Sequence, residues 1–298
     1  MKHLSMAIII LGVLLFSCTH EPMLEENPLE LENEIKAEAP LEDPAPVPMK
    51  NHSSKWSKPT HTNVMAVCAS QWGLSSARSA QMAAASEMPD VYQSGIENAY
   101  NQQWSHAYLY TIWGIQIWGD ADDDCHDNID GDSGESESPE GYNGKWAGYY
   151  YNQGNQSMGD WYVGYAGHFM QDVGLVLHSS LPSLAMLTHH FDYEAWVNNN
   201  LTQGHNFLAM VSADYNYYPV TDLKQGIKNC AYGSSYSNSD LGENSWDAYV
   251  DSGYPTGTGT GSSALVNYTG QMLVRAARFT KGMIKYALDK YGQWNSNY

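Results

Sequence analysis

The segment from Gly164 to Trp196 constrains the fold of this chain more than any other, because it places histidines and carboxylates in an otherwise apolar run. Four of the 11 histidines of the chain lie in this segment: His168, His178, His189 and His190. A neutral imidazole needs a hydrogen-bond partner once it is buried. The segment is therefore either a core with unusual polar residues or a metal site.

The spacing of these residues is typical of metal ligands on helices. His168 and Asp172 are four residues apart, which places both side chains on one face of a helix, one turn apart. His190 and Glu194 repeat that spacing, and His178 follows Asp172 by six residues. Imidazole nitrogen and carboxylate oxygen suit Zn²⁺, and no cysteine is interleaved, which argues against a cysteine-rich structural zinc module.

The alternative interpretation is that these residues are core histidines with satisfied hydrogen bonds, or charge pairs on helix surfaces. For any one of them that alternative is the better explanation. Five such residues at these spacings in fewer than thirty positions favour the metal site. His189, beside His190, is interpreted as a solvated helix residue and is left out of the predicted site.

The pattern His168-x3-Asp172-x5-His178, followed by His190-x3-Glu194, resembles the zinc-dependent phospholipase C family and its relatives, the S1/P1 nucleases. Proteins of that family are mainly helical and bind three zinc ions through an N-terminal tryptophan, five histidines and three carboxylates. Three upstream segments resemble the rest of the ligand set, so the resemblance covers residues 56–194. These segments are "WSKPTH" with Trp56 and His61, "MPDVY" with Asp90, and "NQQWSHAY" with His106.

The resemblance implies a ligand set for three zinc ions and a role for one carboxylate. Asp90, as a ligand that faces the attacking water, is implied to position or deprotonate that water, and is the predicted catalytic residue. The implied ligands are Asp90, His106, His168 and Asp172 for one ion, His178, His190 and Glu194 for a second, and Trp56, His61 and the bridging Asp172 for a third.

The chain departs from the family pattern in ways that affect this set. The family often has tyrosine after the first histidine and proline before the third, where this chain has Phe169 and Leu177. Trp56 offers an amino group only if the chain is cut after Lys55. A lipid on Cys18 and a free amine on Trp56 therefore exclude each other on one intact chain.

The N-terminal region predicts export. Residues 1–18 have a positive start and a short apolar core, as in a signal peptide, and Cys18 resembles the cysteine of a bacterial lipobox, with an ordinary cleavage site as the alternative. Residues 19–55 are rich in Pro and Glu and are predicted to be a disordered tether or propeptide. The protein is then secreted or lipid-anchored at the cell surface or in the periplasm, with residues 56–298 as one domain.

The fold class predicted for that domain is mainly α, because strand alternation is scarce. Helix-compatible runs occupy 62–73, 75–88, 91–119 (as one or two helices), 161–175 and 191–201, whereas Asp120–Gly154 is interpreted as a loop or insertion. The last helix, within 270–294, is the clearest. Its predicted inner face consists of Leu273, Ala277, Thr280, Ile284, Ala287 and Tyr291.

Two further expectations concern cysteines and the acidic segment. Cys125 and Cys230 are the favoured disulfide pair, and Cys68 is expected to be a buried thiol. Residues 120–140 contain ten carboxylates and neither lysine nor arginine. That segment is predicted to be either a calcium site or a solvated acidic loop, since it lacks the glycine and final acid of an EF-hand.

The expected activity is hydrolysis of phospholipids by a zinc-dependent phospholipase C that acts at a membrane surface. The protein is expected to be a monomer. The formal net charge of -19 gives no steering toward a polyanion, and Glu194 resembles the phospholipase branch. The Trp56/His61 spacing instead resembles the nuclease branch, which leaves single-stranded nucleic acid as an alternative substrate. A third possibility is a non-catalytic surface lipoprotein that keeps its metals for stability and binds a ligand on the aromatic segment "GYYYNQGNQSMGDWYVGY".

Overall fold

The computed structural model describes residues 59–92, 106–110, 116–131 and 145–294. The chain divides into two units, Met1–Asn51 and His52–Tyr298, and every described residue belongs to the second. The expected signal peptide with Cys18, the tether and Trp56 lie outside the described residues. Among the described helices, none is both long and apolar enough to cross a membrane.

The described part of the chain is mainly helical, which confirms the predicted fold class. One antiparallel strand pair, β1 (Leu109–Tyr110) with β2 (Gln116–Trp118), accompanies the helices. The helices are α2 (Pro59–Gln71), α3 (Ser76–Ala85), α4 (Met88–Tyr92), α6 (Ala121–Asp130), α7 (Ala147–Asn152), α8 (Gln156–Asp172), α9 (Val176–Ser179), α10 (Leu184–Asn199), α11 (Phe207–Ala213), α12 (Leu223–Tyr232), α13 (Asp240–Asp251) and α14 (Ser263–Tyr291).

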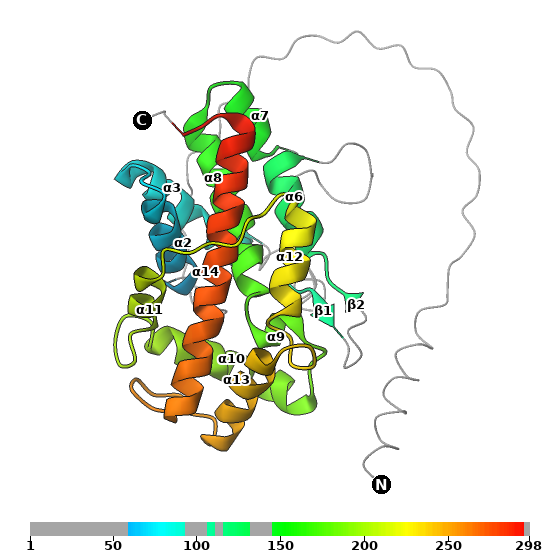
Figure 1. Cartoon of the computed structure of the whole chain (residues 1–298), viewed down its shortest axis with the longest axis vertical. Coiled ribbons are helices and arrows are strands. Elements are labelled where there is room, and N and C mark those ends of the chain that lie inside the picture. Colours follow the sequence, from blue (N-terminus) through cyan, green and yellow to red (C-terminus); the bar gives the residue numbers. More distant parts are fainter. Residues whose placement is uncertain (1–58, 93–105, 111–115, 132–144, 295–298) are drawn as a thin grey trace, which may run out of the picture. The chain divides into compact units, whose positions relative to one another are not determined.

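Helices α8 and α14 pack against each other at the centre of this unit (Figure 1). Helix α8 is buried along almost its whole length, with α3, α6 and α7 packed around it. The predicted inner face of α14 is buried from Leu273 to Ala287, while Tyr291 at its end is half-buried. The two central helices thus form a rigid support for residues at their ends.

A close helix contact places the end of α3 next to α8. A Cβ added at Gly164 would lie 2.2 Å from the carbonyl oxygen of Met82, so the two backbones can approach only because this residue is glycine. The contact brings Ser86, just after α3, to the side of α8 that carries His168. Helix α4, which carries Asp90, follows directly.

The interpretation of Asp120–Gly154 as a loop was wrong for the described residues of that segment, which form α6 and α7. Ala121, Cys125 and Ile129 lie four residues apart and are buried, so α6 has a continuous apolar face. Three aspartates in its first turn interact favourably with the positive end of the helix dipole. Residues 132–140 lie outside the described part of the chain.

The helices expected within 91–119 are also not found where the structure describes that segment beyond α4. Its described residues there form β1 and β2, and Tyr110 additionally bridges to Ser180. The amide of Tyr108 donates to the carbonyl of His178 at 2.9 Å, and the amide of Leu181 donates to Tyr110 at 3.1 Å. Contacts with a distant segment therefore decide the extended conformation.

The predicted disulfide was wrong. Cys125 and Cys230 are both free thiols in the core, as is Cys68, whose burial was predicted. Cys125 contacts the sulfur of Met283, whereas Cys230 contacts the carbonyl of Met170. Each cysteine is thus a small core residue on a different helix.

The aromatic segment expected as a ligand platform packs inward instead. Tyr150, Tyr151, Tyr162 and Tyr165 are all buried, on α7 and α8. Tyr151 donates a 2.6 Å hydrogen bond to the buried carboxylate of Asp160. These rings are therefore part of the core rather than an open binding surface.

Candidate metal centre

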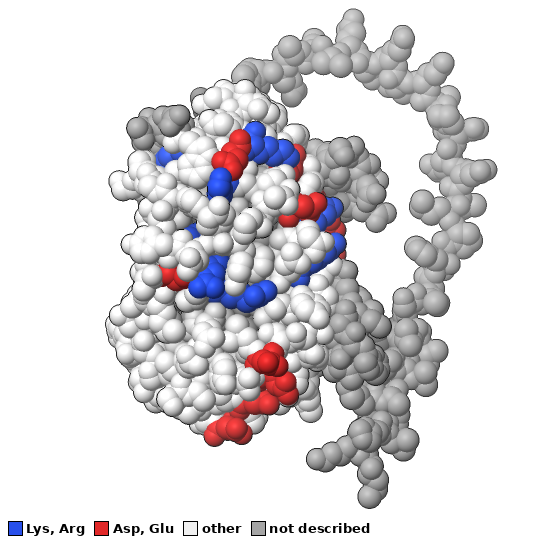
Figure 2. Space-filling model, viewed as in Figure 1, with Lys and Arg blue, Asp and Glu red and all other residues white. Residues whose placement is uncertain are grey.

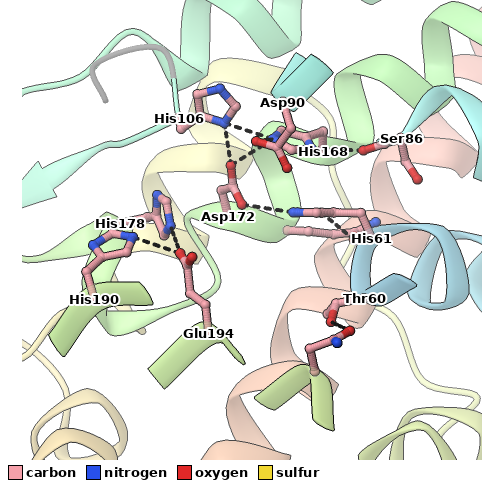
Figure 3. Close-up of polar contacts among 12 residues, drawn as sticks. Thr60, His61, Ser86, Asp90, His106, His168, Asp172, His178, His190 and Glu194 are labelled. Carbon is pink, nitrogen blue, oxygen red and sulfur yellow. Dashed lines mark hydrogen bonds and ion pairs between the residues drawn. The ribbon is translucent and has the colours of Figure 1, made fainter. Parts of the chain in front are cut away.

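Eight of the nine predicted metal ligands lie in three groups whose ligand atoms are close enough to hold metal ions (Figure 3). The ninth, Trp56, lies outside the described residues, so its role as a ligand stays a prediction. The groups are His61, His168 and Asp172; Asp90, His106 and His168; and His178, His190 and Glu194.

The ligands are gathered from six separate segments of the chain. His61 lies in the first turn of α2, Asp90 on α4, and His106 just before β1. Helix α8 contributes His168 and Asp172, on one face as the spacing predicted. The remaining three lie on α9 and α10, with His178 on the short helix that follows the end of α8.

Asp172 belongs to the first group and also contacts His106 of the second. Its Oδ2 atom lies 2.7 Å from Nδ1 of His106 and 3.0 Å from Nε2 of His168. Its Oδ1 atom lies 3.2 Å from Nε2 of His61. A carboxylate that is 2 % exposed thus faces three imidazoles, an arrangement in which it can bridge two cations.

The hydrogen bond at Nδ1 of His168 determines the protonation of its other ring nitrogen, Nε2. Nδ1 of His168 donates to the carbonyl oxygen of Ser86 at 2.8 Å, so Nε2 of the neutral ring carries a lone pair. That lone pair faces Oδ2 of Asp172 and Nδ1 of His106, the latter at 2.8 Å. Lone pairs that face one another repel, and a cation between them, either a proton or a metal ion, removes that repulsion. The geometry is therefore compatible with a bound metal ion.

His61 is oriented in the same way. Its Nδ1 atom lies 3.0 Å from Oε1 of Gln171, which accepts the ring proton and leaves Nε2 directed at Asp172. Metal-binding histidines commonly donate their second ring nitrogen to an oxygen in this way. Ser86 and Gln171 are positioning residues that sequence reasoning missed, because a serine carbonyl and a glutamine carry no motif of their own.

Asp90 supplies the least engaged oxygen of the site. Its Oδ1 atom lies 3.7 Å from Nε2 of His168, and its Oδ2 atom is buried and accepts no hydrogen bond from the described residues. A buried carboxylate oxygen without a donor is costly unless a cation or an ordered water satisfies it. The donor set around Asp90 therefore fits a bound metal ion with a coordinated water.

The third group is more open than the first two. Oε1 of Glu194 lies 3.0 Å from Nε2 of His178 and 2.7 Å from Nε2 of His190. The side chains of His178 and His190 are 12 % and 19 % exposed, those of His106 and Asp90 in the second group are 9 % and 11 % exposed, and those of His61 and His168 are fully buried. The third group thus lies nearest the surface, where a substrate can reach it.

Electrostatic coupling links the groups. Burial alone raises the pKa of Asp172, but the nearby imidazoles of His168, His178 and His61 outweigh burial and hold that pKa well below its ordinary value. Burial also raises the pKa of Glu194, but His190 and His178 together outweigh burial. The pKa of Glu194 is therefore below its ordinary value. Both carboxylates therefore stay ionised at neutral pH, as metal ligands must be.

We expect the binding of a divalent metal ion to release a proton from His168. Burial lowers the pKa of this ring, but the carboxylates of Asp172 and Asp90 raise it more, to about 9 in the metal-free protein. The proton is therefore bound at pH 7 and stabilises the metal-free fold below pH 6.5, and this contribution is lost as pH rises through about 9. A metal ion must displace this proton, so the apparent affinity for a test ion such as Zn²⁺ should rise with pH up to about 9.

Titration calorimetry in buffers of different ionisation enthalpy measures this release. At pH 7 the observed enthalpy should depend on the buffer, with proton release to the buffer, and the dependence should shrink as pH approaches 10. Zinc binding with no buffer dependence at pH 7 would contradict the raised pKa of His168.

The described part of the acidic segment does not resemble a calcium site. Asp122 pairs with Lys228 at 3.1 Å, and Asp123 pairs with Lys224. Asp130 accepts from the hydroxyls of Tyr286 and Tyr291 at 2.7 and 2.8 Å. These carboxylates lie on a helix and hold α6 to α12 and α14, so the calcium prediction gains no support from residues 120–131.

His189 is not part of any group, as expected. Its Nδ1 atom lies 3.1 Å from Oδ2 of Asp192, and its ring stacks on Tyr254 with centroids 3.8 Å apart.

No protein-family model matches this chain, and no curated protein matches it either. The metal-binding interpretation therefore depends on the residues and their geometry alone.

Proposed function

We propose that this protein is a zinc-dependent phosphodiester hydrolase that acts on phospholipids as a phospholipase C. The observation that carries the proposal is the convergence of three histidine and carboxylate groups, two of which share His168. Nitrogen and oxygen donors without cysteine favour Zn²⁺, and zinc at these groups would supply an acidified water and positive charge for phosphoryl oxygens.

The chain's own residues have distinct roles in this reaction. Asp90, with one buried oxygen free of hydrogen bonds from the described residues, accepts a proton from the attacking water and orients that water. Ser86 and Gln171 hold the rings of His168 and His61 in place. The third group, whose histidines are the most exposed of the candidate ligands, would hold the metal ion that a phosphate ester reaches first.

The charges of the surface favour a phospholipid over a nucleic acid. Much of the basic charge on the described surface is paired, as for Lys224 with Asp123 and Arg278 with Asp214 (Figure 2). The chain as a whole has a formal net charge of -19, which does not attract a polyanion. Glu194, the last candidate ligand in the chain, also resembles the phospholipase branch of the zinc-dependent phospholipase C family, which favours a phospholipid substrate.

The test offers phosphatidylcholine vesicles and single-stranded DNA in parallel to the exported, zinc-loaded protein, with and without chelator. Chelator-sensitive release of water-soluble phosphate ester from the lipid, without acid-soluble nucleotide from DNA, is the expected result. Release from DNA alone would make the protein a nuclease. Turnover of neither substrate would overturn the proposal in favour of a non-catalytic binding protein.

A further inference from the structure

Helix α10 carries a stripe of exposed apolar side chains at its N-terminal end. Leu184 is 81 % exposed, Leu187 is 51 % exposed and Phe191 is 53 % exposed. Their spacing of three and four residues places them on one face of the helix. We call these three residues the α10 stripe. Large apolar residues that gather on one exposed face commonly mark a binding surface.

The α10 stripe adjoins the third metal-binding group. His190 and Glu194 lie on the same helix, and helical periodicity places them between the stripe and the buried face that contains Tyr193 and Val197. The ring of His190 contacts that of Phe191, with centroids 5.3 Å apart. A molecule that covers the stripe therefore lies directly beside the most open of the three groups.

The sequence that leads up to the stripe and through it is free of fixed charge, and Asp192 is the first charged residue after it. From Val173 to Phe191 the chain contains no lysine, arginine, aspartate or glutamate, although the whole chain contains 47 such residues. Exposed leucine and phenylalanine side chains can enter the boundary between the headgroups and acyl chains of a lipid layer. Because no lysine or arginine from Val173 to Phe191 is there to attract anionic headgroups, a zwitterionic surface is the matching occupant.

We propose that the α10 stripe docks the protein on a zwitterionic phospholipid surface and so brings lipid headgroups to the third metal-binding group. This inference rests on the proposed function, since it assumes that phospholipid is the substrate. The three side chains enter the boundary between headgroups and acyl chains. His178 and His190 then face the headgroup layer.

Vesicle sedimentation tests the docking without any need for turnover. The exported protein carries Cys18→Ser, which removes any lipid anchor there, and is mixed with phosphatidylcholine vesicles in chelator. The variant Leu184→Gln/Leu187→Gln/Phe191→Gln should bind the vesicles at least about tenfold more weakly, because three apolar side chains no longer leave water. Its circular dichroism should be unchanged, since all three residues are exposed.

The matched control removes exposed aromatic residues elsewhere. Tyr215 and Tyr232 are 74 % and 48 % exposed, and neither lies on α10. The variant Tyr215→Gln/Tyr232→Gln should bind vesicles as the parent does. Equal binding by the stripe variant and the parent, or stronger binding to anionic phosphatidylglycerol vesicles, would overturn the inference.

A fluorescent probe locates the contact directly. Cys68, Cys125 and Cys230 are buried, so a polarity-sensitive dye attached to Leu187→Cys in the Cys18→Ser chain reports on the stripe. Its emission should shift to the blue on addition of phosphatidylcholine vesicles, and the same dye at Tyr215→Cys should not shift. A blue shift that instead follows protein concentration without vesicles would assign the stripe to a second copy of the chain.

The two proposals fail separately. Stripe-dependent vesicle binding without hydrolysis of any lipid would leave the docking intact and remove the phospholipase activity. Chelator-sensitive hydrolysis with vesicle binding that does not depend on the stripe would leave the activity and remove the docking.

Discussion

Replacement of Asp172 by asparagine is expected to reduce lipid hydrolysis at least about a thousandfold, the loss that several kcal/mol of metal-ion stabilisation represents. Both oxygens of Asp172 face imidazole nitrogens, at 2.7 to 3.2 Å. An amide lacks the negative charge and presents only one acceptor oxygen. The variant should therefore bind less zinc, measured by inductively coupled plasma mass spectrometry after dialysis, with circular dichroism to confirm the fold.

The matched control for this change is Asp192→Asn. Asp192 lies on α10, is 52 % exposed on its side chain and pairs only with His189 among the contacts of the described residues. This variant should keep the parent's zinc content and activity. A full zinc content and normal turnover in Asp172→Asn would show that this carboxylate does not hold the metal.

Replacement of Arg78 by methionine is expected to lower the free energy of unfolding by about 3–5 kcal/mol, because it leaves a buried carboxylate without its cation. Arg78 on α3 forms a two-point contact with Asp160 on α8, at 2.7 and 2.8 Å. Both residues are at most 1 % exposed. Arg78 also donates to the carbonyl of Gln293 at 2.6 Å, beyond the end of α14. Urea denaturation followed by circular dichroism measures the change.

Two further variants identify the cause of that loss. Arg78→Met/Asp160→Leu should recover much of the stability, since an apolar pair of similar size carries no desolvation cost. Lys285→Met removes a cation from an exposed pair with Asp289 and should change stability by less than about 1 kcal/mol. A loss below about 1 kcal/mol in Arg78→Met would show that the buried pair contributes little.

The pairs of candidate ligands could be predicted because their geometry is local. His168 with Asp172, and His190 with Glu194, lie on α8 and α10 at the spacing that brings side chains onto one face. The side chains of each pair lie in contact, at 3.0 and 2.7 Å, as helix periodicity allows. The final helix could be predicted for the same reason, from the periodicity of its buried face.

Features that depend on distant partners were mispredicted or missed. Helix α6 consists largely of poor helix formers, yet its apolar face and its pairs with Lys224 and Lys228 stabilise it. The thiols of Cys125 and Cys230 are directed to different core neighbours, which no spacing in the sequence reveals. Ser86 acts through its backbone carbonyl, so its identity carried no signal.

The sequence by itself determined the helical class and the residue types and spacings of the candidate ligands, since helix periodicity and donor chemistry depend only on near neighbours. Tertiary structure decided which of those residues meet. His61, Asp90 and His106 reach Asp172 or His168 only because α2, α4 and the segment before β1 pack around the end of α8. That packing also leaves the α10 stripe exposed beside the third group, because burial depends on the whole arrangement of helices rather than on any one of them.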